Sequence, residues 1–141
     1  MPSRARQGAV AIAIYLRART WLSHHLPALP LDCVLTSLDS PRGERIETNS
    51  TTVARVLAPT ERVLSRLLRS TDTCMFRALA RFAALSALGT PAVFVLGAPT
   101  GDQPGHAWVE IDGRPFMEPG LPRFPRVLEH PNRAARAARR E

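Results

Sequence analysis

The segment TCMFRALARFAALSALGTPAVFVLG, Thr73 to Gly97, predicts a helix followed at once by a buried strand. Residues 70–73 are all of N-cap type, and apolar residues then recur at the three- and four-residue spacing of an amphipathic helix. Gly89 and Pro91 are typical of a helix end. The apolar, β-branched stretch from Ala92 to Gly97 is typical of a strand. We therefore expect a helix that leads directly into a sheet.

This predicted helix has one apolar face, with arginines beside it. Arg77 and Arg81 lie off that face in the helical pattern. We expect the helix to pack against the rest of the domain through the apolar side chains of Met75, Ala78, Leu79, Phe82 and Leu85.

The next elements form a predicted hairpin. HAWVEI, His106 to Ile111, alternates apolar and polar residues, which predicts a half-buried strand. Asp112–Gly113 is a hairpin-turn signal, and RPFME, Arg114 to Glu118, is the predicted returning strand. Because a helix packed on an antiparallel sheet is an α+β arrangement, we expect an α+β fold.

The N-terminal part of the chain predicts a mostly helical layer. Residues 9–26 favour a helix or a mixture of strand and helix, and residues 31–38 favour a short helix. Residues 38–52 are polar and rich in turn formers, which predicts a loop. The following helix is expected to start near Thr60.

The length of 141 residues favours one domain overall. Within it we expect a helical layer and loop over residues 1–52 and the main core over residues 53–130. The basic tail, residues 131–141, is predicted to be a fraying helix or a flexible end.

The composition limits the classes of partner. The formal net charge is +7, and all nineteen basic residues are arginines. Such an excess attracts acidic peptides, nucleic acids or anionic membranes, although a solvated arginine surface also accounts for it. With one tyrosine and scattered phenylalanines, aromatic residues are not interleaved with the arginines as they are where bases stack, so nucleic acid is not the expected partner.

The N-terminus and the cysteines bear on the compartment. The apolar run from Ala9 to Leu16 is too short to span a membrane and has no small-residue cleavage site after it. Two cysteines, Cys33 and Cys74, do not make a disulfide framework. We therefore expect a cytoplasmic, reduced protein without stable membrane insertion.

Cys74 and His106 are the candidate reactive pair. Cys74 lies in the first turn of its predicted helix, where orphan N–H groups and the helix dipole stabilise a thiolate. By position alone, Cys74 is better explained as a small buried apolar residue, and a lone strand histidine is usually structural. A helix N-terminus and a neighbouring strand that carry both residues match the geometry of a thiolate–imidazolium pair.

An acidic side chain near His106 is expected to orient its imidazole. Asp112 lies too far along the extended strand. A turn that pairs Trp108 with Glu118 would set Glu118 on the same face as His106, whereas a strict two-residue turn would set it on the opposite face. We favour Glu118, and we expect Glu110 to pair with an arginine.

These motifs resemble a known family. The segments TCMFRALARFAALSALGTPAVFVLG and HAWVEIDGRPFMEPG are similar to the transglutaminase-like leader peptidases of lasso-peptide biosynthesis. The resemblance covers residues 70–128, including the stretch from Phe124 to Leu128. It implies a transglutaminase-like, papain-like catalytic core, in which the helix that bears the cysteine packs on the sheet that bears the histidine and the acid.

The resemblance also implies a function. Cys74, His106 and Glu118 would be a catalytic triad, although the family usually has Asp where this chain has Glu118. The enzyme would cleave the leader from a precursor peptide and free the core amine for a separate ATP-dependent lasso cyclase. Because the chain has no room for a fused leader-binding module, the resemblance implies a separate small winged-helix protein that recognises the leader.

No cofactor or metal is expected. His24, His25 and His130 have no ligand spacing with Cys33, and no phosphate-binding loop is visible. Two other functions are compatible with the sequence: a transglutaminase-fold acyl transferase, and a non-catalytic basic binding module in which the cysteine and histidine are incidental.

Overall fold

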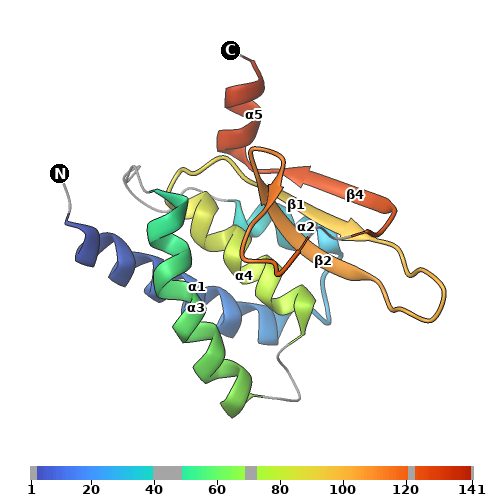
Figure 1. Cartoon of the computed structure of the whole chain (residues 1–141), viewed down its shortest axis with the longest axis horizontal. Helices are drawn as coiled ribbons and strands as arrows, with labels where there is room; N and C mark the ends of the chain where they lie inside the picture. The colour runs from blue at the N-terminus through green and yellow to red at the C-terminus, as the bar shows by residue number, and fades with distance from the viewer. Residues whose placement is uncertain (1–2, 40–48, 69–72, 121–122, 141) are drawn as a thin grey trace.

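The structure is a computed structural model that describes residues 3–39, 49–68, 73–120 and 123–140. An antiparallel sheet covers one side of helix α4 and the N-terminal helices pack on the other side (Figure 1). The fold is therefore α+β, as expected. In the described ranges the elements are α1 Arg4–His25, α2 Leu31–Leu38, α3 Ser50–Leu67, α4 Cys74–Ala87, β1 Val93–Gly97, β2 His106–Ile111, β3 Arg114–Pro115, β4 Arg126–Pro131 and α5 Arg133–Arg139.

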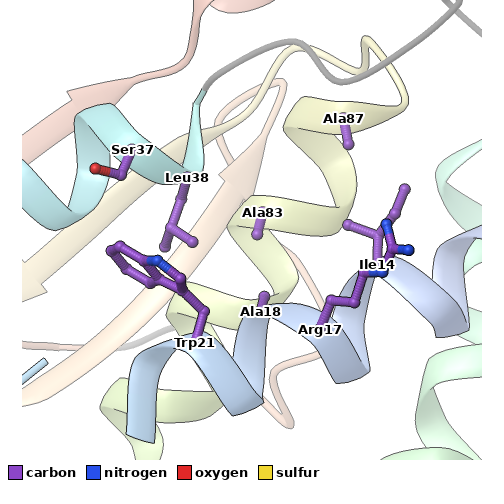
Figure 2. Close-up of a pocket in the computed structure, with 8 residues that line it drawn as sticks. All are labelled: Ile14, Arg17, Ala18, Trp21, Ser37, Leu38, Ala83 and Ala87. Carbon is purple, nitrogen blue, oxygen red and sulfur yellow. The ribbon is translucent and has the colours of Figure 1, made fainter. Parts of the chain in front are cut away.

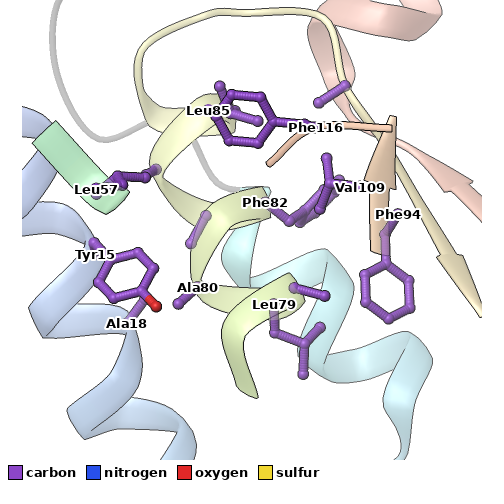
Figure 3. Packing of buried hydrophobic residues seen from close by; sticks show 14 of the residues in the cluster. Tyr15, Ala18, Leu57, Leu79, Ala80, Phe82, Leu85, Phe94, Val109 and Phe116 are labelled. Atoms are coloured by element: carbon purple, nitrogen blue, oxygen red, sulfur yellow. The ribbon is translucent and has the colours of Figure 1, made fainter. Parts of the chain in front are cut away.

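Helix α4 lies at the centre of the core (Figure 3). Every residue from Ala78 to Leu85 is buried, because α1 packs on one side of α4 and β2 packs on another. The helix begins where the sequence predicts, since the Thr73 side chain accepts a hydrogen bond from the Phe76 N–H. The prediction of a single buried face is wrong for Arg81, which is only 6% exposed.

The sheet has the order β3-β2-β1-β4, with antiparallel neighbours throughout. Strand β2 was expected to be half-buried, but Ala107 to Glu110 are all buried. Its Ala107 and Val109 pack into the core beside α4, while Trp108 and Glu110 on the other face are covered by side chains that include Arg126. Strand β4 was not predicted, and it makes β1 a central strand.

The hairpin has a strict two-residue turn, with positive φ angles at Asp112 (52°) and Gly113 (75°). Glu110 therefore pairs with Pro115, so the expected pairing of Trp108 with Glu118 is wrong. The returning strand β3 is also shorter than predicted. The chain leaves the ladder after β3, and Met117 has a φ of 58°, which turns the chain just before Glu118.

The described part of the N-terminal layer contains helices and no strands. The mixture of strand and helix weighed for residues 9–26 is helix α1 throughout, and residues 31–38 form the predicted helix α2. Helix α3 begins at Ser50 and not near Thr60, because the Asn49 side chain caps it by accepting a hydrogen bond from the Thr51 N–H. Residues 40–48 of the predicted loop lie outside the described residues.

Of the two alternatives for the basic tail, a fraying helix or a flexible end, the structure has a helix, α5, and this helix is tied to the core. The fully buried Asn132 side chain accepts hydrogen bonds from the Ala92 and Ala135 N–H groups, and so caps α5 and fixes it to β1. Asp39 accepts a hydrogen bond from the Arg133 N–H. None of the helices in the described ranges is long and apolar enough to cross a membrane.

Candidate active site

Cys74 is the first residue of α4 and is partly buried. Thr73 caps the helix by accepting two hydrogen bonds. Its side-chain oxygen accepts one from the Phe76 N–H, and its carbonyl oxygen accepts one from the Arg77 N–H. The N–H groups of Cys74 and Met75 have no acceptor among the described residues. Among the described residues, two backbone donors are thus without an acceptor at the helix end that carries the sulfur.

His106 is the first residue of β2, and aromatic rings hold its imidazole. The ring stacks on Trp108 with centroids 5.8 Å apart, and it lies 5.6 Å from the Phe124 ring. Gly97, which pairs with His106 across the sheet, permits this packing, because a Cβ there would come within 2.4 Å of the Phe124 Cβ. Rotation of the imidazole is thus restricted before any substrate binds.

Glu118 contacts His106 directly. Its Oε2 lies 3.0 Å from His106 Nε2, and the Glu118 side chain is 11% exposed. Since a carboxylate only accepts hydrogen bonds, this contact assigns the proton to Nε2. Nδ1, which has no hydrogen-bond partner among the described residues, is then the basic nitrogen.

The second oxygen of Glu118 belongs to a buried ionic network. Arg81 Nη1 lies 3.5 Å from Glu118 Oε1. The same guanidinium donates to both oxygens of Glu61, from Nε at 2.8 Å and from Nη2 at 2.6 Å. The Tyr15 hydroxyl donates to Glu61 Oε2 at 2.8 Å. The contacts thus run continuously from α1 through α3 and α4 to the loop that precedes β4.

Burial and charge perturb the two ends of this network. Burial, followed by the negative charge of Glu61, raises the pKa of Tyr15, which therefore stays protonated and remains a donor. Burial works against the charge on Arg81, but the hydrogen bonds and charge of Glu61 outweigh it and raise the pKa of Arg81. Both donors to Glu61 are thus fixed in their hydrogen-bonding forms.

Of the three sequence-predicted residues, the structure joins His106 and Glu118 by a contact. Helix α4 packs against β2, and the two elements run in the same direction, so Cys74 and His106 both lie at their starting ends (Figure 1). Cys74 and Arg81 are about two turns apart and therefore share a face of α4. No hydrogen bond joins the Cys74 sulfur to His106.

Two hollows lie near α4. The pocket of ≈ 340 Å³ in Figure 2 is formed by α1, α2 and the second half of α4, around Trp21 and Leu38, and it contains none of the candidate residues. A second groove, of ≈ 530 Å³, lies between α3 and α4. Four arginines and Glu61 are among its lining residues, and it extends to Met117, the neighbour of Glu118; the arginines are Arg62, Arg66, Arg77 and Arg81.

Sequence reasoning did not find Arg81, Glu61 or Tyr15. Each looks like an ordinary helical residue in its own segment, and only the packing of α1, α3 and α4 brings them together. The expected pairing of Glu110 with an arginine is confirmed, with Arg126 Nη2 2.6 Å from Glu110 Oε2. The part of the chain that the structure describes contains no cluster of three residues that could hold a metal ion.

Comparison with known proteins agrees with this architecture. The sequence model of the transglutaminase-like superfamily matches residues 8–129, which run from α1 into β4. Searches of curated proteins and of solved structures found no match. Members of this superfamily usually use a catalytic cysteine, histidine and aspartate. The chain belongs to the transglutaminase-like superfamily.

Proposed function

We propose that this protein is a cysteine peptidase that removes the leader from a ribosomally made lasso-peptide precursor. The 3.0 Å contact between His106 and Glu118, next to a helix that begins with Cys74, is the observation that carries the proposal. It supplies an oriented base at the end of the molecule where the helix presents a nucleophile. The specificity for a lasso-peptide leader rests on the resemblance of the motifs.

The proposed reaction proceeds through an acyl-enzyme. The Cys74 thiolate attacks the carbonyl carbon at the junction of leader and core, and the N–H groups of Cys74 and Met75 stabilise the oxyanion. The C–N bond breaks as His106 donates a proton to the departing amine of the core. His106 then takes a proton from water, which attacks the thioester and releases the leader carboxylate and the Cys74 sulfur.

The sulfur and the imidazole need not be hydrogen-bonded before substrate binds. Catalytic hydrogen bonds are often long in free enzymes and shorten in the substrate complex. In this proposal Nδ1 of His106 is the nitrogen that faces the sulfur during the reaction, since Nε2 is held by Glu118. Binding of the precursor brings the two groups into contact.

The basic groove between α3 and α4 gives the proposed enzyme a place to hold its partners. Arg62 and Arg66 project from α3, and Arg77 projects from α4, into this groove. An acidic segment of the precursor, or of a separate winged-helix protein that recognises the leader, would be attracted there. The freed core amine would then pass to a separate ATP-dependent cyclase.

The test is cleavage of a candidate lasso-peptide precursor in water enriched in heavy oxygen, with a candidate winged-helix leader-binding protein present. Both candidates are to be sought among the genes adjacent to this one. We expect two fragments, with one heavy oxygen in the new carboxylate of the leader, and no cleavage by Cys74→Ala. An adduct with an added amine would instead identify an acyl transferase. Equal activity of Cys74→Ala would refute nucleophilic catalysis and leave the non-catalytic binding module.

A further inference from the structure

The side chain of Glu118 has two different partners, one for each oxygen. Oε2 faces His106 at 3.0 Å, and Oε1 faces Arg81 at 3.5 Å. Arg81 is itself held by Glu61 through two hydrogen bonds from Nε and Nη2. The orientation of the Glu118 carboxylate is therefore coupled to a guanidinium that cannot rotate without breaking its contacts with Glu61.

A glutamate at this position needs such an anchor. Its side chain has one more rotatable bond than aspartate, and free rotation lets the carboxylate leave the imidazole. Arginine suits the task, because its rigid fork of donors can hold two carboxylates at once, which a lysine ammonium does not do with the same geometry. The Glu118 and Arg81 side chains are only 11% and 7% exposed, so water competes weakly for these contacts.

The anchor extends into the N-terminal helices. Tyr15 of α1 donates to Glu61, and Glu61 of α3 fixes Arg81. Apart from the Arg81 contact at 3.5 Å, each of these contacts is 3.0 Å or shorter. Two helices without any proposed catalytic residue thereby reach the imidazole through an unbroken series of side chains.

We propose that Arg81 is a positioning residue that aims Glu118 at His106, with Glu61 and Tyr15 holding Arg81 in place. This inference rests on the proposed function, because it assigns Arg81 a task only if His106 activates Cys74. Arg81 forms hydrogen bonds with Glu61 and Glu118 and none with His106 or the Cys74 sulfur in the described part of the chain, so it acts through Glu118. Its effect should therefore vanish when Glu118 has lost its charge.

A double-mutant cycle tests this coupling without a known substrate. The probe is iodoacetamide, which alkylates thiolates, and peptide mass spectrometry reads Cys74 against the exposed Cys33 of the same molecule. The variants are Arg81→Lys, Glu118→Gln and the double variant. Arg136→Lys is the matched control, since Arg136 pairs with the buried Asp39 at 3.0 Å, away from His106. Thermal unfolding monitors the fold of each variant.

We expect Glu118→Gln to slow Cys74 alkylation at mildly acidic pH about tenfold. Arg81→Lys should slow it about threefold in the parent and should not slow it further in the Glu118→Gln background. Arg136→Lys should leave the rate unchanged. An equal slowing by Arg81→Lys in both backgrounds, or no slowing in the parent, would overturn the inference.

Tyr15→Phe provides the same test if Arg81→Lys does not fold. It removes one hydrogen bond to Glu61, and we expect it to slow Cys74 alkylation about twofold in the parent only. Equal rates for Tyr15→Phe and the parent would then overturn the inference. If Cys74 of the parent is alkylated no faster than Cys33, the proposed function itself is contradicted. If Cys74 is alkylated faster than Cys33 but at the same rate in these variants, only the inference is contradicted.

Discussion

Two arginines in this protein each bind two glutamates, yet their surroundings differ. Arg81 joins Glu61 to Glu118 inside the molecule, and its side chain is 7% exposed. Arg126 joins Glu110 to Glu129 on the outer side of the sheet, and its side chain is 45% exposed. The same pairing of groups thus occurs once with all three side chains largely buried, and once with a half-exposed arginine, one buried glutamate and one exposed glutamate.

The comparison shows what burial adds to an ion pair. At the surface, water and salt can replace a lost partner, so an exposed pair contributes little to stability. In the interior a glutamate without its arginine stays charged and poorly hydrated, or it takes up a proton. The interior network reaches the imidazole of His106 through a hydrogen-bonded carboxylate, whereas the Arg126 network reaches it only through the stacked Trp108 ring, so the interior network should have the larger influence on activity.

The largest difference is expected when one glutamate of each network is removed. Glu118→Ala should lower kcat/KM for precursor cleavage about a hundredfold, because His106 loses its orienting carboxylate. Glu129→Ala removes the exposed partner of Arg126 and should leave kcat/KM unchanged. Steady-state kinetics of the two variants measure this difference. Equal losses of kcat/KM would contradict the distinction between the two networks.

The arginines themselves should differ in their contribution to stability. Arg81→Met should lower the free energy of unfolding by about 3–5 kcal/mol, because Glu61 is left buried without its cation. Arg126→Met should lower it by less, about 1–2 kcal/mol, because Arg126 is half-exposed and the buried Glu110 keeps the Trp108 N–H as a donor. Urea unfolding measures both values, and equal losses would show that burial does not separate the networks.

The basic groove adjoins the interior network and not the exposed one. Arg66→Glu should raise KM for the precursor about tenfold through charge repulsion of an acidic segment, while Cys74 alkylation stays unchanged. Arg123→Glu, at an exposed position three residues before Arg126, should leave KM unchanged. If both reversals have the same effect, net charge and not the groove attracts the precursor.

The smallest effect concerns His130, which follows Glu129 in β4. Burial lowers the pKa of His130 below its ordinary 6.5, and its Nε2 is buried without a hydrogen-bond partner in the described ranges. The unfolded chain therefore binds a proton more readily than the folded protein does, so stability decreases as the pH falls from above 6.5 towards the lowered value. Unfolding at several pH values should show a smaller decrease for His130→Phe, and identical curves would contradict this assignment.

Local signals were enough to place Cys74 and His106. The N-cap at Thr73, the end of the helix at Gly89 and the Asp112–Gly113 turn each depend on a few neighbouring residues, and the structure has all three. The short α2 and the buried β1 were predicted for the same reason. These features fix which ends of α4 and β2 carry the reactive groups.

Contacts between distant parts of the chain determine the features that the sequence did not predict. Arg81 is buried because α1 and α3 enclose α4, and no pattern within α4 reports that enclosure. Glu118 reaches His106 although the turn has the register expected to separate them, because the positive φ of Met117 redirects the chain. Strand β4 follows Pro125, ends at Pro131 and is stabilised by pairing with β1, so its own residues give a weak signal.

The central claim is that His106 activates Cys74, and the rate of Cys74 alkylation tests it most directly. In the parent at mildly acidic pH, we expect iodoacetamide to alkylate Cys74 about tenfold or more faster than the exposed Cys33. In His106→Ala most of that advantage should disappear while Cys33 reacts as before. A Cys74 that keeps its full advantage without the imidazole would contradict the account.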